Sequence, residues 1–242
     1  MDAEARGLTD GDLETVTGIG GFFALRTAPP APGAYVPLAR VYAGDHAPLT
    51  ARVTRVGERL RAPEYRVAAS VAQLGLAARL WSVTLGPAAL YGVFPDVTPG
   101  RLYWDPARSA PDDLWWDGRA TRPGTPEELR DAVQYGHLAP LADALRAAGP
   151  VSARLLWGNA GSALAGAVRE LTRWAHRTGR PEAAARGAGL AAALLDHPDL
   201  SGTLQGPALR RRTCCLYYRC PGGGLCGDCV FDHPPHRSAP TR

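Results

Sequence analysis

All five cysteines of the chain lie close together, between positions 214 and 229, so the preceding residues form a body without any thiol. The first sixteen residues are polar and acidic and lack the basic and apolar stretches of a signal peptide, which predicts a cytoplasmic protein. Cytoplasmic thiols are kept reduced, and an odd number of cysteines also argues against a disulfide framework. The local density of cysteines therefore indicates a metal site.

The composition predicts a soluble globular protein. With 242 residues and 45% hydrophobic content, the chain is long enough to bury a core. The longest apolar-leaning stretch, residues 67–90, is interrupted by Arg79 and Pro87, so we expect a buried helix there and not an integral membrane segment. The formal net charge is +4 and every basic residue is Arg. Because the arginines are scattered along the sequence, we expect no nucleic-acid partner.

Patterns typical of helices and of strands alternate in the first half of the chain. The second half shows helical patterns only. Thr125, Pro126 and Glu128 form a capping-box arrangement that marks the start of one helix. The predicted helices cover residues 9–16, 48–61, 63–85, 125–136 with a restart near 140, 151–177 and 182–195. The predicted strands cover residues 22–26, 35–42, 89–94, 101–104 and 114–116.

These patterns predict an α+β fold that is predominantly helical, with a small antiparallel sheet in the N-terminal half and a cysteine-rich C-terminal segment. No linker separates independent domains. We expect one body over residues 1–205, a cluster-binding segment over 206–232 and a disordered tail over 233–242.

The cysteine-rich segment contains two pairs of cysteines, Cys214-Cys215 and Cys226-x2-Cys229, separated by ten residues. A Cys-x2-Cys turn lets two thiolates converge on one metal, and structural zinc and iron–sulfur clusters both use it. Adjacent cysteines diverge in a strand, which suits a two-iron cluster better than one small tetrahedral ion. The spacing alone leaves an iron–sulfur cluster, structural zinc and unrelated thiols as alternatives.

The residues around the cysteines suit an anionic cluster. Two ferric ions, two sulfides and four thiolates sum formally to a charge of about −2, which Arg211, Arg212 and Arg219 can partly offset. The run Pro221 to Gly224 allows close approach of the backbone and N–H···S bonds. Cys220, inside the spacer, is interpreted as a small hydrophobic residue beside a turn.

The pattern Cys-Cys-x10-Cys-x2-Cys, written CCLYYRCPGGGLCGDC, resembles the signature of the FhuF family of siderophore-iron reductases. The resemblance is strongest over residues 210–231, and the stretch 152–163 also looks like a family segment. Cys220 departs from the family pattern, in which an aliphatic residue is expected. The resemblance implies a [2Fe-2S] cluster whose ligands are Cys214, Cys215, Cys226 and Cys229.

The resemblance also implies the activity. We expect one-electron reduction of a ferric siderophore, of the hydroxamate type, with release of Fe(II) in the cytoplasm. No nicotinamide-binding fingerprint is visible, so we expect a separate electron donor, a ferredoxin or a flavoprotein. Transient docking near a siderophore transporter is a further expectation. The residues predicted to contact the siderophore are Trp115, Trp116, Arg154, Trp157 and Asn159.

Of two other interpretations, the first stays open on the residues alone and the second is disfavoured by them. The four cysteines could hold structural zinc in a siderophore-binding module without redox activity, and this protein would be colourless. A siderophore synthetase would need an ATP-binding region, and no glycine-rich phosphate loop precedes a helix here.

Overall fold

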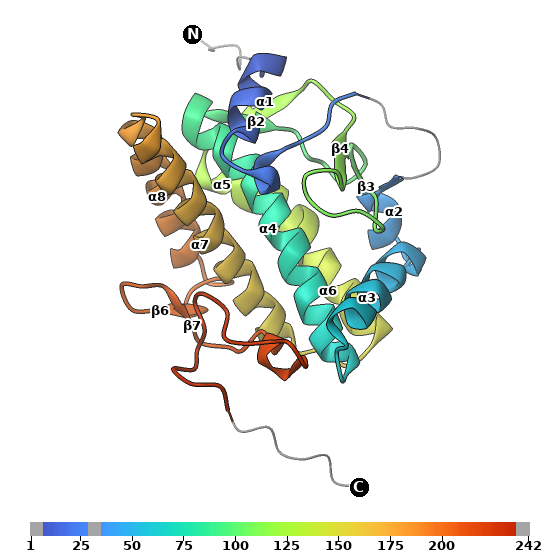
Figure 1. Cartoon of the computed structure of the whole chain (residues 1–242). Coiled ribbons are helices and arrows are strands. Elements are labelled where there is room, and N and C mark those ends of the chain that lie inside the picture. Colours follow the sequence, from blue (N-terminus) through green and yellow to red (C-terminus); the bar gives the residue numbers. More distant parts are fainter. Residues whose placement is uncertain (1–6, 29–34, 236–242) are drawn as a thin grey trace, which may run out of the picture.

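One long apolar helix organises the fold. The computed structural model describes residues 7–28 and 35–235, and in it α4 (Tyr65–Tyr91) runs through the centre with α7 (Ala153–Arg177), α8 (Pro181–Asp196) and α3 (Ala47–Leu60) packed around it (Figure 1). Because α4 is covered on several sides, most of its residues are buried and its apolar surface is wider than one stripe.

The remaining elements are short and surround this helical centre. The other helices are α1 (Asp10–Thr17), α2 (Leu38–Tyr42), α5 (Pro126–Leu129) and α6 (Ala139–Ala148), the turns η1 (Gly21–Phe23) and η3 (Tyr217–Arg219) are 3₁₀-helical, and η2 (Arg130–Leu138) is π-helical. The strands are β1 (Val36–Pro37), β2 (Val93–Pro95), β3 (Leu102–Trp104), β4 (Leu114–Trp116), β5 (Thr121–Pro123), β6 (Leu204–Gln205) and β7 (Arg210–Arg211). They pair antiparallel in the orders β1-β3-β4, β2-β5 and β6-β7, which confirms the predicted fold class.

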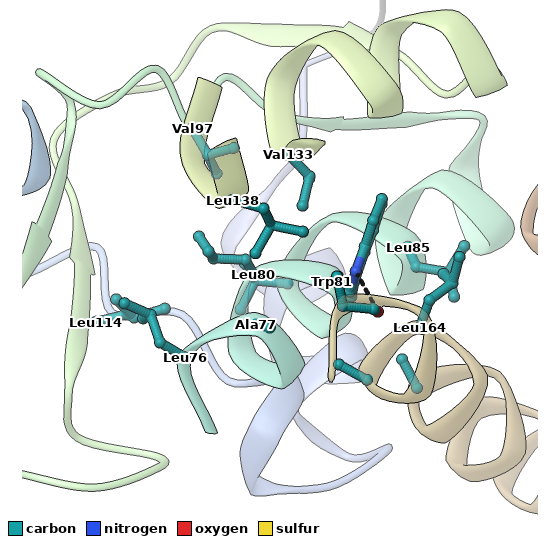
Figure 2. Close-up of a cluster of buried hydrophobic side chains, with 14 of the residues drawn as sticks. Leu76, Ala77, Leu80, Trp81, Leu85, Val97, Leu114, Val133, Leu138 and Leu164 are labelled. Carbon is teal, nitrogen blue, oxygen red and sulfur yellow. Dashed lines mark hydrogen bonds between the residues drawn. The ribbon is translucent and has the colours of Figure 1, made fainter. Parts of the chain in front are cut away.

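The core surrounds α4, and one part of it lies between α4 and α7. Trp81 and Leu80 of α4 are fully buried, and small residues on α7 such as Ala160 and Ala163 let the two helices approach closely (Figure 2). The indole Nε1 of Trp81 donates a hydrogen bond to the backbone oxygen of Ala160 at 3.1 Å. This contact satisfies the only polar atom of the Trp81 side chain, so its burial costs no hydrogen bond.

The predicted end of the central helix at residue 85, followed by a strand at 89–94, was wrong. The helix continues through Pro87 to Tyr91, because Ala88 and Ala89 are buried against its neighbours and that burial outweighs the missing N–H group. Gly92, with a φ of +74°, supplies the left-handed turn that ends the helix. Only Val93–Pro95 is extended.

Two other predicted strands were also wrong. Residues 38–42 form α2 because Leu38 and Val41, three positions apart, are both fully buried, and this helical spacing outweighs their strand preference. Residues 22–26 form a turn and a single bridge from Arg26 to β4. The predicted break near position 136 is also wrong, since η2 joins α5 to α6 without interruption.

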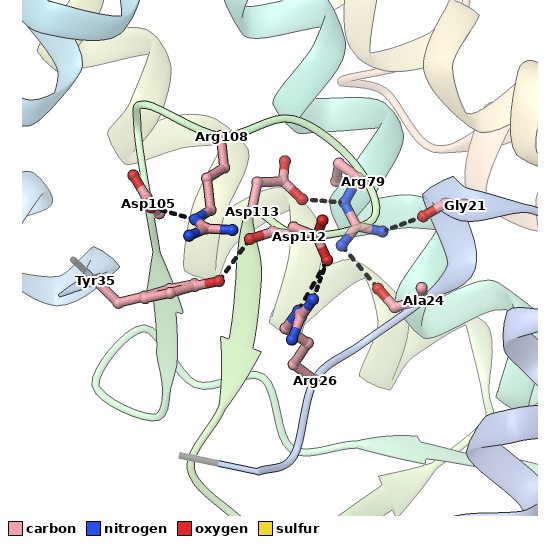
Figure 3. A network of polar contacts seen from close by, with 9 residues as sticks. All are labelled: Gly21, Ala24, Arg26, Tyr35, Arg79, Asp105, Arg108, Asp112 and Asp113. Atoms are coloured by element: carbon pink, nitrogen blue, oxygen red, sulfur yellow. Dashed lines mark hydrogen bonds and ion pairs between the residues drawn. The ribbon is translucent and has the colours of Figure 1, made fainter. Parts of the chain in front are cut away.

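A buried arginine explains why residues 22–26 form no strand. The Arg79 guanidinium on α4 donates to the backbone oxygens of Gly21 and Ala24 (Figure 3) and also to that of Phe22. These oxygens would otherwise be available to a strand partner. Its Nε also pairs with Asp113 at 2.8 Å, and both side chains are buried. Burial lowers the pKa of Arg79, and the Asp113 carboxylate opposes that effect. The pair thus holds the N-terminal segment and β4 against α4.

Candidate metal centre

Two glycines of α7 provide the surface on which the cysteine-rich segment lies. A Cβ atom at Gly158 would lie 1.9 Å from Thr213 Oγ1, and one at Gly161 would lie 2.4 Å from Thr203 Oγ1. Both positions therefore require glycine so that the segment can reach the helix backbone. In Figure 1 the segment crosses the end of α7 where that helix begins, on the side opposite to α1.

The backbone of the segment closes the two cysteine pairs into one compact unit. The N–H group of Arg211 donates to the oxygen of Asp228 at 2.9 Å, which joins the strand before Cys214 to the turn that contains Cys226. Leu216 adopts a φ of +67°, and its N–H group points at Cys214 Sγ at 3.2 Å. Backbone N–H groups directed at sulfur stabilise the thiolate form that a metal requires.

The thiols of the two pairs lie close enough to affect one another's ionisation. Interactions with the thiols of Cys214 and then Cys226 lower the pKa of Cys215. The same contacts, together with burial, raise the pKa values of Cys214 and Cys226, while the charge of Cys229 adds to the effect at Cys214. Cys215 and Cys229 are buried, and Cys214 and Cys226 are partly exposed. The two cysteine pairs therefore lie near one another, because members of each pair affect the ionisation of the other.

Arg211 places a positive charge beside these sulfurs. Its side chain is fully buried, donates from Nε to the Thr213 backbone oxygen at 3.0 Å and donates from Nη2 to Asn159 Oδ1. Its charge lowers the pKa values of Cys215 and Cys226. This effect is weaker than that of the neighbouring thiols. Nη1 is buried and has no hydrogen-bond partner among residues 7–28 and 35–235. An unpaired buried donor of this kind fits an anionic group bound by the cysteines.

A chain of hydrogen bonds joins Arg211 to the core. Asn159 Nδ2 donates to the oxygens of Ser70 at 3.0 and 3.1 Å, and Ser70 Oγ donates to the Cys215 backbone oxygen at 2.7 Å. On the other side, Ser162 Oγ donates to Asp228 Oδ2 at 2.6 Å. Ser70, Ser162 and Asp228 were not predicted as site residues. The available signal for the two serines was their place as polar residues on largely apolar helices.

The other predicted arginines and Cys220 lie further out. Arg212 is exposed, and Arg219 forms an ion pair with Glu64 at 2.8 Å. Cys220 is buried in the turn after η3, with 1% of its surface exposed. Of the three arginines predicted to surround the site, only Arg211 is buried among the thiols, so its charge is the one least screened by water.

The residues predicted to contact the siderophore do not form one pocket. Trp115 and Trp116 lie on β4 beside a cavity of about 290 Å³ whose lining includes Arg101 and Arg119 but none of the predicted residues from α7. Their indole groups donate to backbone oxygens within the same region. On α7, Arg154 is exposed, Trp157 is half-buried against the core and Asn159 is fully buried in its contacts with Arg211 and Ser70.

The site has the donor chemistry for a thiolate-bound cluster. The four cysteines, the N–H group of Leu216 and the unpaired Arg211 Nη1 all suit an anionic group. Cys214, Cys215, Cys226 and Cys229 are the residues that would hold it. Over residues 7–28 and 35–235, no three His, Cys, Asp or Glu side chains are arranged to hold a single metal ion. None of the helices in those ranges is long and apolar enough to cross a membrane.

Comparison with known families agrees with the geometry of the site. Residues 211–231 match the sequence model described as the FhuF 2Fe-2S C-terminal domain. Residues 93–219, more than half of the chain, match the model described as ferric iron reductase FhuF-like transporter. A search of curated proteins finds no match. The chain therefore belongs to the FhuF ferric iron reductase family, and its C-terminal cysteines form the [2Fe-2S] domain of that family.

Proposed function

We propose that this protein transfers one electron to the iron of a ferric hydroxamate siderophore and so releases Fe(II) in the cytoplasm. Hydroxamate oxygens bind hard Fe(III) far more tightly than Fe(II), so reduction frees the metal. The observation that supports the proposal best is the cysteine site with its buried Arg211, within a chain of the ferric iron reductase family. A [2Fe-2S] cluster, when bound, exchanges one electron at a time.

Each element of the site has a role in this proposal. Cys214, Cys215, Cys226 and Cys229 bind the cluster as thiolates. Arg211 offsets part of the negative charge from a buried position, and Arg212 and Arg219 contribute weakly because they are exposed or already paired. The partly exposed Cys214 and Cys226 place their side of the site toward the surface, where an electron can enter or leave.

A groove beside the site offers a place for the siderophore. It has a volume of about 430 Å³, within the range of small-molecule sites, and runs between α4 and α7. Its lining includes the exposed ring of Phe22, Leu74, Ser162 and Glu170. Ser162 also donates to Asp228 between two of the predicted ligands, so the groove adjoins the cysteine-rich segment. A siderophore bound there would lie next to the electron source.

The test is to purify the protein without oxygen, record its visible absorption and mix the reduced protein with a ferric hydroxamate in the presence of a ferrous chelator. We expect a red-brown protein that bleaches on reduction and recolours as the ferrous chelate forms. Cys226→Ser should abolish both signals, whereas Cys220→Ser serves as the matched control. A colourless protein that holds zinc would support the siderophore-binding module, and a coloured protein that cannot reduce the siderophore would reject the substrate.

A further inference from the structure

Although arginines occur along the whole sequence, their excess over acidic residues is local to one surface of this protein. Between positions 52 and 66 the chain has five arginines and two glutamates, and Arg219 packs against the same stretch through Glu64. Six arginines less two glutamates leave an excess of four positive charges, which equals the formal net charge of +4 for the whole chain. The rest of the chain is therefore neutral on balance. We call this surface the basic ridge; it consists of Arg52, Arg55, Arg59, Arg61, Arg66 and Arg219.

The arginines in the middle of the basic ridge have no carboxylate partner within the described part of the chain. Arg55, Arg59 and Arg61 are exposed and take part in no ion pair there, whereas Arg66 and Arg219 share Glu64. Arg55 and Arg59 lie one helical turn apart on α3, so they project from the same face. Their repulsion contributes to lowering the pKa of Arg52, after the larger effect of burial. The ridge thus carries an excess of positive charge, and its middle arginines, Arg55, Arg59 and Arg61, are the unpaired ones among the described residues.

The basic ridge adjoins the cysteine-rich segment. Arg59 and Arg61, at the end of α3, line a cavity of about 120 Å³ together with Tyr217, Cys220 and Gly223 of the segment. The turn is tight here, since a Cβ atom at Gly223 would lie 2.0 Å from the backbone oxygen of Tyr217. An electron carrier seated on the ridge would therefore lie against the segment that holds the cluster ligands.

We propose that the basic ridge is the docking surface for an acidic one-electron carrier protein, which supplies the electron for the reaction. The proposal rests on the proposed function, because only a reductase needs a donor. The reduced carrier loses one electron and the site gains one, and no bond or proton transfer is required. Arginines with no carboxylate partner hold such a carrier by long-range attraction, which speeds encounter and weakens as salt is added.

The ridge and the groove separate donor and substrate. The groove lies between α4 and α7 and is lined mainly by apolar and small residues, whereas the ridge lies on α3 and is charged. Both adjoin the cysteine-rich segment, one through Ser162 and the other through Arg59. A carrier on the ridge would therefore leave the groove open to the siderophore.

The test is stopped-flow reduction of the oxidised holoprotein by a reduced acidic plant-type ferredoxin, followed by visible absorption. We expect Arg55→Glu/Arg59→Glu to slow the second-order rate by about 10- to 100-fold at low ionic strength and to flatten its dependence on salt. Arg169→Glu/Arg177→Glu, a matched pair of exposed arginines on α7, should leave the rate within about twofold. Reduction by dithionite and oxidation by the ferric siderophore should be unchanged in both variants.

Several outcomes would overturn the proposal. An equal rate for wild type and the ridge variant at low salt would show that the ferredoxin docks elsewhere. If the ridge variant instead loses binding to vesicles of anionic phosphatidylglycerol while its rate with ferredoxin is unchanged, the ridge is a membrane-binding surface. Failure of the wild-type protein to reduce any siderophore would reject the proposed function, yet the ferredoxin rates would still report separately on the ridge.

Discussion

Replacing Arg211 by Met should make the cluster harder to reduce. Arg211 is fully buried, and its charge acts on Cys215 and Cys226. An added electron makes the site more negative, so loss of a nearby positive charge disfavours the reduced form. The reduction potential should therefore become more negative, while the neighbouring Arg212, which is exposed, provides a control at the adjacent position.

The magnitude follows from Coulomb's law. Two unit charges ~7 to ~12 Å apart at an effective dielectric constant of ~20 interact by about 1.4 to 2.4 kcal/mol. Since about 1.4 kcal/mol corresponds to 59 mV for a one-electron couple, Arg211→Met should lower the potential by about 60 to 100 mV. The same charge in water at ~10 Å contributes about 0.4 kcal/mol, so Arg212→Met should lower it by less than about 20 mV.

The assay is an anaerobic dye-equilibrium titration followed by visible absorption, with wild type, Arg211→Met, Arg211→Lys and Arg212→Met compared under one buffer. Arg211→Lys keeps the charge and should stay within about 30 mV of wild type. An unchanged absorption spectrum in the oxidised state checks that the cluster is intact in each variant. Equal potentials for Arg211→Met and wild type, or equal shifts for Arg211→Met and Arg212→Met, would refute the reasoning.

Three further predictions concern a buried histidine, a glycine of α7 and the groove. Burial lowers the pKa of His137 to about 4 from its usual 6.5, so the unfolded chain takes up a proton between those values and the folded protein does not. The free energy of unfolding should fall by about 3 kcal/mol as the pH drops from 6.5 to 4, and urea titrations of His137→Gln should lack this part of the slope. Gly158→Ala should displace the cysteine-rich segment and reduce bound iron in the purified protein. Gly166→Ala, on the same helix, should not, because a Cβ atom there makes only an ordinary contact with Arg169 Nη2 at 3.7 Å. Phe22→Ser should raise the KM for the ferric siderophore several-fold with little change in kcat, and an unchanged KM would place the siderophore outside the groove.

Much of the fold could be predicted because local signals and burial agree. The capping residue Thr125 accepts the Glu128 N–H group as the sequence indicates, and the long apolar patterns of α4 and α7 form helices. β3 and β4 pair antiparallel as the turn residues between them suggest. The wrong strands have a common cause, which is that tertiary contacts, such as the carbonyl bonds of Arg79, cannot be seen in a local sequence window.

The candidate site also has a part that could be predicted from the sequence and a part that could not. The four cysteines and Arg211 lie within one short stretch, so their proximity could be predicted from spacing. The partners from distant helices, such as Asn159 and Ser70, depend on how α4 and α7 pack, and spacing contains no information on that packing. For the same reason Trp115 and Asn159, which the sequence analysis placed in one pocket, lie in different parts of the fold.

The glycines at positions 158 and 161 have a further consequence, because the helical body is synthesised before the cysteine-rich segment that packs on it. Every helix from α1 to α8 precedes Cys214 in the chain, so synthesis completes the helical body before any of the four predicted ligands. The surface of α7 that receives the segment is then already in place, bare of side chains at the two positions where Thr203 and Thr213 will lie. The cluster can therefore be inserted into a short segment that is synthesised last and packs against a helical body that has already folded. If no cluster is supplied, we expect the helical body to remain folded.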